Sequence, residues 1–389
     1  MKKYLPLLLI VASCTPQVDT GKLTADTDLL GDVIRIDRKA IEEVYPDETG
    51  LPFGINQKGD PITSQLVQGE TGWSAVLLDA NQFDQLKGID FVEEAKYPAF
   101  KSHVQVRLGK RESEKVYQSI TSEIRPDDHV EMQQGPDYLY QGEGPIWEND
   151  VVGFRTYFDE RNGFDIFGKM TPRMMAHEIS VKGNYHELLD WGMDVLKVGN
   201  SLGAGALGIY RNDTLYPIGD ALEDRFEIIE NGPLVASFSL VYKSPKSFPN
   251  LTIIRKISIV KGLPGYLTEN QIFGANSEQL ATGIVTLHSQ NLLKDEADNY
   301  MVFATHDPQA ELDKYLGMAV ITRTEMIAGA APESDAPVTT TYFQRPKSSR
   351  AFDYLFLAGW ELQDQAYKDE AVFRERALAW GKQYVKWTK

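Results

Sequence analysis

The residues best suited to chemistry in this chain lie between Gly142 and Tyr210. This stretch mixes aromatic rings, carboxylates, cations and glycines more densely than a buried core requires. Aromatic rings can cover the apolar C–H faces of a sugar, while charged groups fix its hydroxyls and any acid group. The stretch therefore predicts a site for a polar, ring-shaped ligand, although a β-domain with charged loops would give the same local pattern.

Among the 6 histidines of the chain, His186 is the strongest candidate for proton transfer. It follows Tyr185 and precedes the segment Trp191–Gly199, and an unperturbed imidazole titrates near neutral pH. His288 ranks second because it ends a predicted strand, where a side chain can project into a cleft. A lone histidine also serves as a structural hydrogen-bond donor, so the neighbouring motif is what favours His186.

Several other kinds of site are absent from the sequence pattern. No pair of histidines has the spacing His-Glu-x-x-His, and no Gly-x-Ser-x-Gly elbow occurs. The glycines of Gly199–Gly208 do not follow the dinucleotide fingerprint, so they indicate a sheet bend or a point of close ligand approach. The sequence requires no cofactor, and a divalent metal held by distant residues stays open.

The N-terminus resembles a bacterial lipoprotein signal. Two lysines precede the apolar run Tyr4–Ala12, which is too short to span a bilayer and ends in Val11-Ala12-Ser13-Cys14. We expect residues 1–13 to be a signal peptide, Cys14 to carry lipid, and residues 14–30 to be a tether. The alternative is an ordinary secretory signal. Because no acidic run follows the cysteine, we expect an anchor in the outer membrane that faces the periplasm, rather than the cell surface.

Composition limits the partners further. Cys14 is the only cysteine, which excludes disulfides and cysteine catalysis in the mature chain. The formal net charge of −16 argues against nucleic acid as a partner, because phosphate binding needs a basic surface. An anionic small ligand remains compatible with this charge, since a few local arginines and lysines can outweigh the global field.

Short strands dominate the body of the chain. Many segments alternate in period two, which is typical of antiparallel strands with one buried face, and turn signals such as Asn231-Gly232-Pro233 separate them. The predicted strands are Val33–Asp37, Trp73–Leu78, His103–Leu108, Val152–Phe158, Phe226–Glu230, Leu234–Tyr242, Leu251–Val260, Leu267–Phe273, Thr282–His288, Met301–Thr305, Leu316–Thr322, Thr339–Phe343 and Tyr354–Ala358.

Helix signals are weak before the C-terminus. There, apolar residues recur at three or four over Asp369–Trp387, which predicts an amphipathic helix laid across the β-body. No linker forces a boundary within the body, so residues 31–389 are predicted to form one domain. The simplest architecture is mainly β, a large antiparallel β-sandwich with a C-terminal amphipathic helix.

Three blocks of the chain resemble the signatures of a bacterial family of unknown function. Its members are often lipoproteins or secreted proteins encoded in polysaccharide-utilisation loci. The matching blocks are Trp147-Glu148-Asn149-Asp150 with Phe154-Arg155-x-Tyr157, then Tyr185-His186 with Gly192-x-Asp194-x-x-Lys197-Val198-Gly199 and Gly203-x-Gly205-x-x-Gly208, and finally Gly359-Trp360. Two positions depart from the family pattern: Gln141–Pro145 replaces a charged stretch, and Asp190 stands where a second histidine is usual.

This resemblance implies a fold and an activity. The family is similar to the galactose-mutarotase-like supersandwich of many carbohydrate-active enzymes, and to an oligosaccharide dehydratase that acts in ulvan breakdown with other polysaccharide-degrading enzymes. Such an enzyme removes water from the non-reducing-end uronic acid and leaves a 4,5-unsaturated sugar. The C5 proton lies α to a carboxylate, so its removal needs a base and a group that stabilises the developing charge.

The resemblance also implies roles for particular residues. Arg155 or Lys197 would hold the uronate carboxylate. His186 would be either the base or the acid, and Tyr157 or Tyr185 would take the other of these two roles. The expected sugar-binding residues are Glu148, Asp150, Asp194 and His288, and the three carboxylates could instead orient His186. Trp147, Trp191 and Trp360 are stacking candidates, although at least one of them is expected to pack in the core. The alternatives are a polysaccharide lyase, a sugar epimerase or mutarotase on the same fold, and a non-catalytic glycan-binding lipoprotein.

Overall fold

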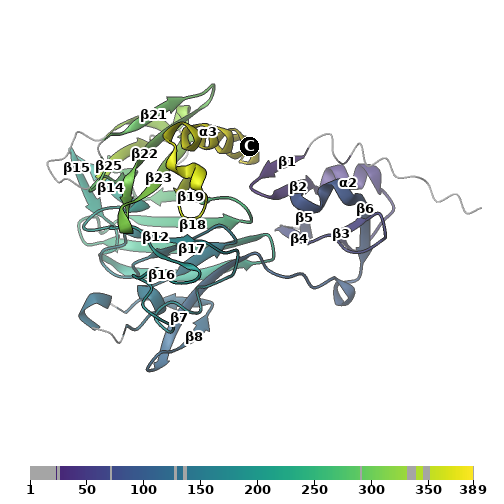
Figure 1. Cartoon of the computed structure of the whole chain (residues 1–389), viewed down its shortest axis with the longest axis horizontal. Coiled ribbons are helices and arrows are strands. Elements are labelled where there is room, and N and C mark those ends of the chain that lie inside the picture. Colours follow the sequence, from purple (N-terminus) through teal and green to yellow (C-terminus); the bar gives the residue numbers. More distant parts are fainter. Residues whose placement is uncertain are drawn as a thin grey trace, which may run out of the picture.

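The computed structural model describes Leu23 and residues 27–70, 72–126, 129–134, 138–289, 291–330, 339–344 and 351–388. These residues form a large β-body with a smaller N-terminal unit beside it (Figure 1). Cys14 and the predicted signal peptide lie outside the described residues. Within the described ranges, no helix combines the length and the apolar character that crossing a membrane requires.

The described part of the N-terminal unit contains two small antiparallel sheets, the α-helix α2 and two short 3-10 helices. Its core consists of residues such as Ile36, Ile41 and Val76. Leu23 belongs to the same core, and residues 28–30 form a strand, so the predicted tether 14–30 is wrong at its end. The elements are the sheet β1 (Asp28–Leu30), β2 (Val33–Asp37), β5 (Gly72–Asp79), β4 (Ser64–Gly69), the sheet β3 (Leu51–Asn56), β6 (Leu86–Val92), and the helix α2 (Arg38–Val44).

The β-body confirms the predicted β-sandwich. A nine-stranded antiparallel sheet forms one layer, and alternating residues of its strands, such as Phe238 and Leu240, enter a single core. Its strands, in spatial order, are β21 (Leu293–Glu296), β22 (Tyr300–Ala310), β23 (Lys314–Arg323), β26 (Ala351–Trp360), β19 (Gly265–Phe273), β18 (Thr252–Val260), β17 (Val235–Pro245), β16 (Ala221–Asn231) and β9 (Ser122–Ile124).

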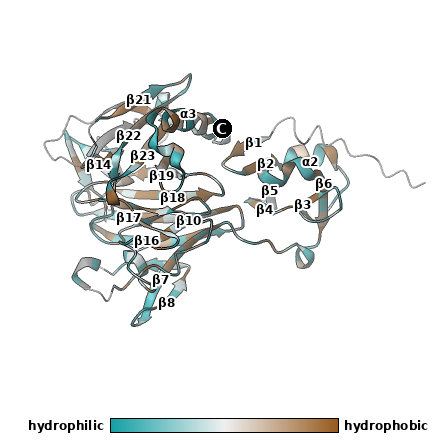
Figure 2. Cartoon of the chain, in the orientation of Figure 1, coloured by the Kyte–Doolittle hydropathy of each residue, from teal (hydrophilic) through white to brown (hydrophobic). Residues whose placement is uncertain are grey.

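Two further sheets pack on the inner face of the nine-stranded sheet, because their apolar residues join the same core. The six-stranded sheet has the order β13 (Gly192–Asp194), β12 (Phe164–Lys169), β11 (Val152–Thr156), β10 (Ile146–Asn149), β7 (Val104–Ser113) and β8 (Val116–Ile120). The five-stranded sheet has the order β15 (Thr214–Pro217), β14 (Ala204–Arg211), β20 (Gln279–Val285), β25 (Thr339–Gln344) and β24 (Ile327–Ala330). In Figure 2, the β7–β8 hairpin at the lower edge of the body is largely hydrophilic.

The C-terminal helix α3 (Glu370–Trp387) confirms the predicted helix to within one residue. The side chain of Asp369 caps it by accepting hydrogen bonds from the N–H groups of Ala371 and Val372. Its buried face, including Phe373 and Tyr384, packs on the outer face of the nine-stranded sheet, together with residues of the N-terminal unit (Figure 1). The helix therefore covers the side of the sheet that faces away from the sandwich core.

Candidate active site

The register of three neighbouring strands brings charged residues together. Arg155 of β11 lies directly opposite Asp165 of β12, and Phe167 of β12 lies opposite Asp194 of β13. Residues two apart on a strand share a face, so Arg155, Asp165 and Asp194 lie on one face of the six-stranded sheet. Phe154, the neighbour of Arg155, points the other way and enters the sandwich core.

The segment between β12 and β13 covers this face of the sheet and delivers His186. It forms a small core of its own on Phe167, with Met175, Ile179, Tyr185 and Trp191. The peptide N–H groups at positions 175 and 176 each donate to Glu148 Oε1 over 2.7 Å. Residues 170–191 are thus fixed on the sheet by packing and by a buried carboxylate.

Arg155 is at the centre of the site and is fully buried. Its Nη2 atom lies 2.7 Å from Asp165 Oδ2 and 2.9 Å from Asp194 Oδ2, and its Nη1 atom lies 3.3 Å from Glu143 Oε1. Burial acts to lower the pKa of the guanidinium, but Tyr157, Asp165 and Asp194 raise it well above the ordinary value. Arg155 also donates to the hydroxyls of Tyr157 and Tyr185, each over 3.2 Å.

The two cations that the sequence proposed for substrate binding both line the cavity but differ in their contacts. A guanidinium has five N–H donors, and those of Arg155 already point at protein oxygens. Lys197, by contrast, has a side chain that is 53% exposed, and its Nζ atom lies 3.5 Å from Glu311 Oε1. Lys197 is therefore the cation that a dissolved carboxylate can reach.

His186 and Asp194 form an imidazole–carboxylate pair. His186 Nδ1 lies 3.3 Å from Asp194 Oδ2, and the imidazole ring rests on the Tyr185 ring with centroids 4.3 Å apart. The hydrogen bond to Asp194 raises the pKa of His186 above its ordinary value, against the effect of burial. With Nδ1 held by the carboxylate, Nε2 is the nitrogen left for proton transfer to a ligand.

Tyr157 and Asp165 form a second pair, which contacts the same Nη2 atom of the arginine. The Tyr157 hydroxyl donates to Asp165 Oδ2 over 3.0 Å. Burial and the nearby charge of Asp194 raise the pKa of Asp165 to about 7, although Arg155 acts to lower it. Burial and Asp165 also raise the pKa of Tyr157, so the phenol stays protonated at neutral pH.

His186, Asp194 and Tyr157 line one cavity of about 570 Å³, whereas Asp165 is buried and is not part of the lining. Leu287 and Glu311 line its far wall, and Gly199 contributes bare backbone with a φ of 57°. The complete lining is Arg155, Tyr157, His186, Asp194, Leu196, Lys197, Val198, Gly199, Leu287 and Glu311. The cavity is of the size of common small-molecule sites. Tyr185 is not in the lining, because its ring lies behind His186.

Other residues expected to contact a sugar lie elsewhere. The stacking role of Trp147, Trp191 and Trp360 is wrong, because all three are at most 2% exposed and pack inside hydrophobic cores. Glu148 is also buried; its Oε2 atom pairs with Lys169 Nζ at 2.6 Å, so it holds the fold together instead of a ligand.

Two further expected contacts lie outside the cavity lining. Asp150 lies in the turn after β10 and accepts from the Gly262 N–H over 2.9 Å. His288 lies in an exposed turn beyond the end of β20, next to Leu287, and is not part of the lining. The prediction of a strand through His288 is wrong, because β20 ends at Val285.

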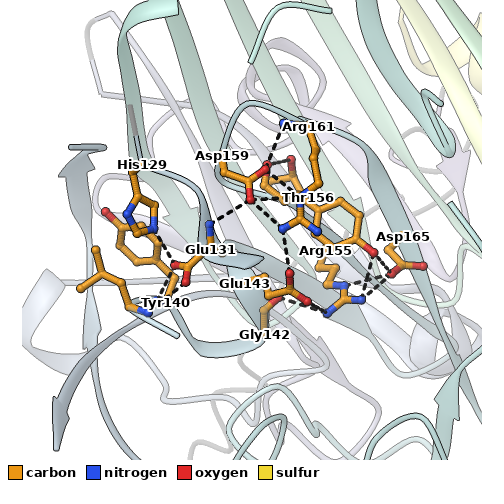
Figure 3. Close-up of polar contacts among 12 residues, drawn as sticks. His129, Glu131, Tyr140, Gly142, Glu143, Arg155, Thr156, Asp159, Arg161 and Asp165 are labelled. Atoms are coloured by element: carbon orange, nitrogen blue, oxygen red, sulfur yellow. Dashed lines mark hydrogen bonds and ion pairs between the residues drawn. The ribbon is translucent and has the colours of Figure 1, made fainter. Parts of the chain in front are cut away.

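Sequence reasoning missed several charged residues at this site. Asp165 reads as an ordinary polar residue until the register places it opposite Arg155. Glu143 comes from the short 3-10 helix before β10 and Arg161 from the loop between β11 and β12, and their ion pairs extend the charged cluster around Arg155 (Figure 3). Among the described residues, no group of three or more His, Cys, Asp or Glu side chains is placed to hold a metal ion.

Two solved structures show a distant similarity to this chain. A protein in glycosyl hydrolase family 38 from Enterococcus faecalis is 11% identical, with a TM-score of 0.45 over 92% of this chain and 45% of that chain. An alpha-mannosidase from Enterococcus faecalis V583 is 9% identical, with a TM-score of 0.44 over 91% of this chain and 43% of that chain. The chain spans less than half the length of either structure.

No curated protein matches this chain. A family described as a domain of unknown function, DUF4861, matches residues 24–384, which include both unit cores, the three sheets of the sandwich and the candidate active site. The chain therefore belongs to the DUF4861 family.

Proposed function

We propose that the protein is a dehydratase that removes water from the non-reducing-end uronic acid of ulvan-type oligosaccharides. The observation that carries this proposal is that His186 and Tyr157, each hydrogen-bonded to a buried carboxylate, line one cavity. His186 with Asp194 and Tyr157 with Asp165 supply the base and the acid that a β-elimination needs, and the cavity adds a reachable cation, Lys197.

The base is His186 in this proposal. Asp194 holds Nδ1, and Nε2 takes the proton from C5 of the uronic acid, which is acidified by the adjacent carboxylate. Lys197 binds that carboxylate and stabilises the charge that develops on it. Its pair with Glu311 is long and partly exposed, so exchange of one carboxylate for another costs little.

The acid is Tyr157. As the C5–H electrons form the C4=C5 double bond, the C4–O bond breaks and the leaving oxygen takes the phenolic proton, so that one water is released. The phenolate that remains lies 3.2 Å from Arg155 Nη2 and 3.0 Å from Asp165. The arginine stabilises the phenolate, and proton transfer from His186 through solvent restores the starting state.

The proposal extends to the location of the enzyme. We infer that lipid on Cys14 anchors the chain in the outer membrane facing the periplasm, where other polysaccharide-degrading enzymes would release its anionic oligosaccharide substrates. This part rests on the sequence of the N-terminus alone.

The test is incubation with uronic-acid oligosaccharides from ulvan, followed by ultraviolet absorbance and mass spectrometry. A rise in absorbance from the conjugated acid, with loss of one water and no chain shortening, is expected. Chain shortening would make the protein a lyase, and isomer exchange without absorbance would make it an epimerase. Binding without any product would identify a glycan-binding protein, and each of these three outcomes overturns the proposal.

A further inference from the structure

A second arginine lies behind the site and contacts the same tyrosine as Arg155. Arg161 belongs to the loop between β11 and β12, and its guanidinium lies 4.0 Å from the centroid of the Tyr157 ring. The Arg155 guanidinium lies 4.8 Å from the same centroid. Two cations on one phenol ring restrict its position, since each is attracted to the electron-rich face of the ring.

Two carboxylates fix Arg161 in turn. Its Nε and Nη2 atoms donate to the two oxygens of Asp159 over 2.9 Å and 2.6 Å, which is a bidentate pair with a fully buried acid. The Nη2 atom also donates to Glu143 Oε2 over 2.7 Å (Figure 3). Bidentate pairs of this kind hold an arginine in one orientation.

Glu143 connects the two arginines. Its Oε1 atom accepts from Arg155 Nη1 and its Oε2 atom accepts from Arg161 Nη2, so one carboxylate spans both guanidinium groups (Figure 3). Its backbone φ is 66°, which lies in the left-handed region that a residue with a side chain rarely adopts. The protein therefore keeps a strained backbone at the residue that links the two cations.

The geometry points to Arg161 as a positioning residue for the proposed dehydration. We infer that Arg161, held by Asp159 and Glu143, fixes the Tyr157 ring and Arg155, and thereby the distance between the acid and the base. Arg161 is not in the lining of the cavity, so it acts through these two residues and not by touching substrate. The expected effect of Arg161 on kcat rests on the proposed function, whereas its expected effect on the position of Tyr157 and Arg155 does not.

The experiment compares the full protein with Arg161→Lys and Arg161→Gln. A lysine keeps the positive charge beside Asp159 but cannot bridge two carboxylates in a fixed plane. We expect kcat to fall about a hundredfold with KM nearly unchanged, since a small misplacement of reacting groups has an effect of this order. The matched control is Arg374→Lys, which removes a similar bidentate pair with Asp295 at helix α3 and should leave kcat unchanged.

A second readout separates positioning from general loss of structure. The His186 imidazole can be titrated by NMR and assigned with a His186→Ala variant. If Arg155 loosens, Asp194 is freed to pair with the imidazole, and the His186 titration should move to higher pH in both Arg161 variants. Unchanged kcat, a rise in KM alone, or an unmoved His186 titration would each overturn the inference. Wild-type protein without turnover would overturn the proposed function, and the titration would still decide the role of Arg161.

Discussion

Asp165 and Asp194 accept hydrogen bonds from the same nitrogen atom, Nη2 of Arg155, over 2.7 Å and 2.9 Å. Each carboxylate also holds one group that faces the cavity, Tyr157 in the first case and His186 in the second. A single buried cation therefore fixes the two candidate proton carriers relative to each other. This arrangement makes the site testable residue by residue.

The first prediction concerns the proposed base. Replacing His186 by alanine should lower kcat about 100- to 10,000-fold, the range expected for loss of a general base. Turnover of uronic-acid oligosaccharides, followed by absorbance, measures the effect. His177→Ala is the matched control, because that histidine belongs to the same covering segment and is similarly exposed, but lies beside Glu178 and is not part of the cavity lining. Full activity of the His186 variant would show that His186 is not the base.

The second prediction concerns pH. Because Asp194 raises the pKa of His186, the neutral imidazole appears only at a higher pH than for a free histidine. The kcat/KM of the enzyme should therefore rise with pH along a limb that lies above the ordinary pKa of histidine. The charged groups that surround this imidazole or share its cavity are Asp194, Arg155, Asp165, Lys197 and Glu311.

The variant Asp194→Asn checks the sign of this shift. It replaces the charged acceptor of the hydrogen bond that is the main cause of the raised pKa by a neutral amide, so the His186 titration should move to lower pH in NMR spectra. A titration that stayed in place would show that Asp194 does not control the imidazole.

Much of the β-body could be predicted from alternation alone. Strands such as β17 and β18 have apolar residues at every second position, and this period predicts antiparallel strands with one buried face. The helix α2 was missed because it is only 7 residues long and buries a single apolar side chain, Ile41. The packing of the N-terminal unit against α3 joins residues hundreds of positions apart, which local patterns do not report.

Local composition singled out some residues of the candidate site but not others. Arg155, Tyr157, His186 and Asp194 stand out because aromatic and charged residues are unusually dense between Gly142 and Tyr210. Asp165 belongs to the same set, but its importance depends on strand register, which one sequence does not specify.

The tryptophans were assigned wrongly for a related reason. A large aromatic residue beside charges suits a sugar site and a sandwich core equally well. Trp147 packs between Phe154 and Phe238 in that core, so only the tertiary structure separates the two readings.

The third prediction concerns the cation that binds substrate. Lys197→Gln should raise KM about 30-fold, because a hydrogen bond between charged groups contributes about 2 kcal/mol. Lys197→Arg should restore most of the affinity. The control is Lys243→Gln, which removes a similarly exposed lysine paired with Glu223 on the outside of the body. An unchanged KM in Lys197→Gln would show that another group binds the carboxylate of the substrate.

The fourth prediction concerns the membrane anchor. Cys14→Ser should leave the protein in the soluble fraction of cells, because the thiol that would carry lipid is gone. Fractionation followed by immunoblotting measures this distribution. A membrane-bound Cys14→Ser protein would contradict lipidation at this position.

The last prediction tests the corrected role of Glu148. Its pair with Lys169 has no exposed side-chain surface at either residue, so Glu148→Gln leaves a buried cation without its counter-charge. Breaking such a pair should lower the free energy of unfolding by about 3–5 kcal/mol, whereas Glu269→Gln breaks an exposed pair with Lys256 and should cost about 0–1 kcal/mol. Denaturant unfolding gives both values, and KM should stay near that of the wild type where the variant is folded. Unchanged stability with a raised KM would instead place Glu148 in contact with the sugar.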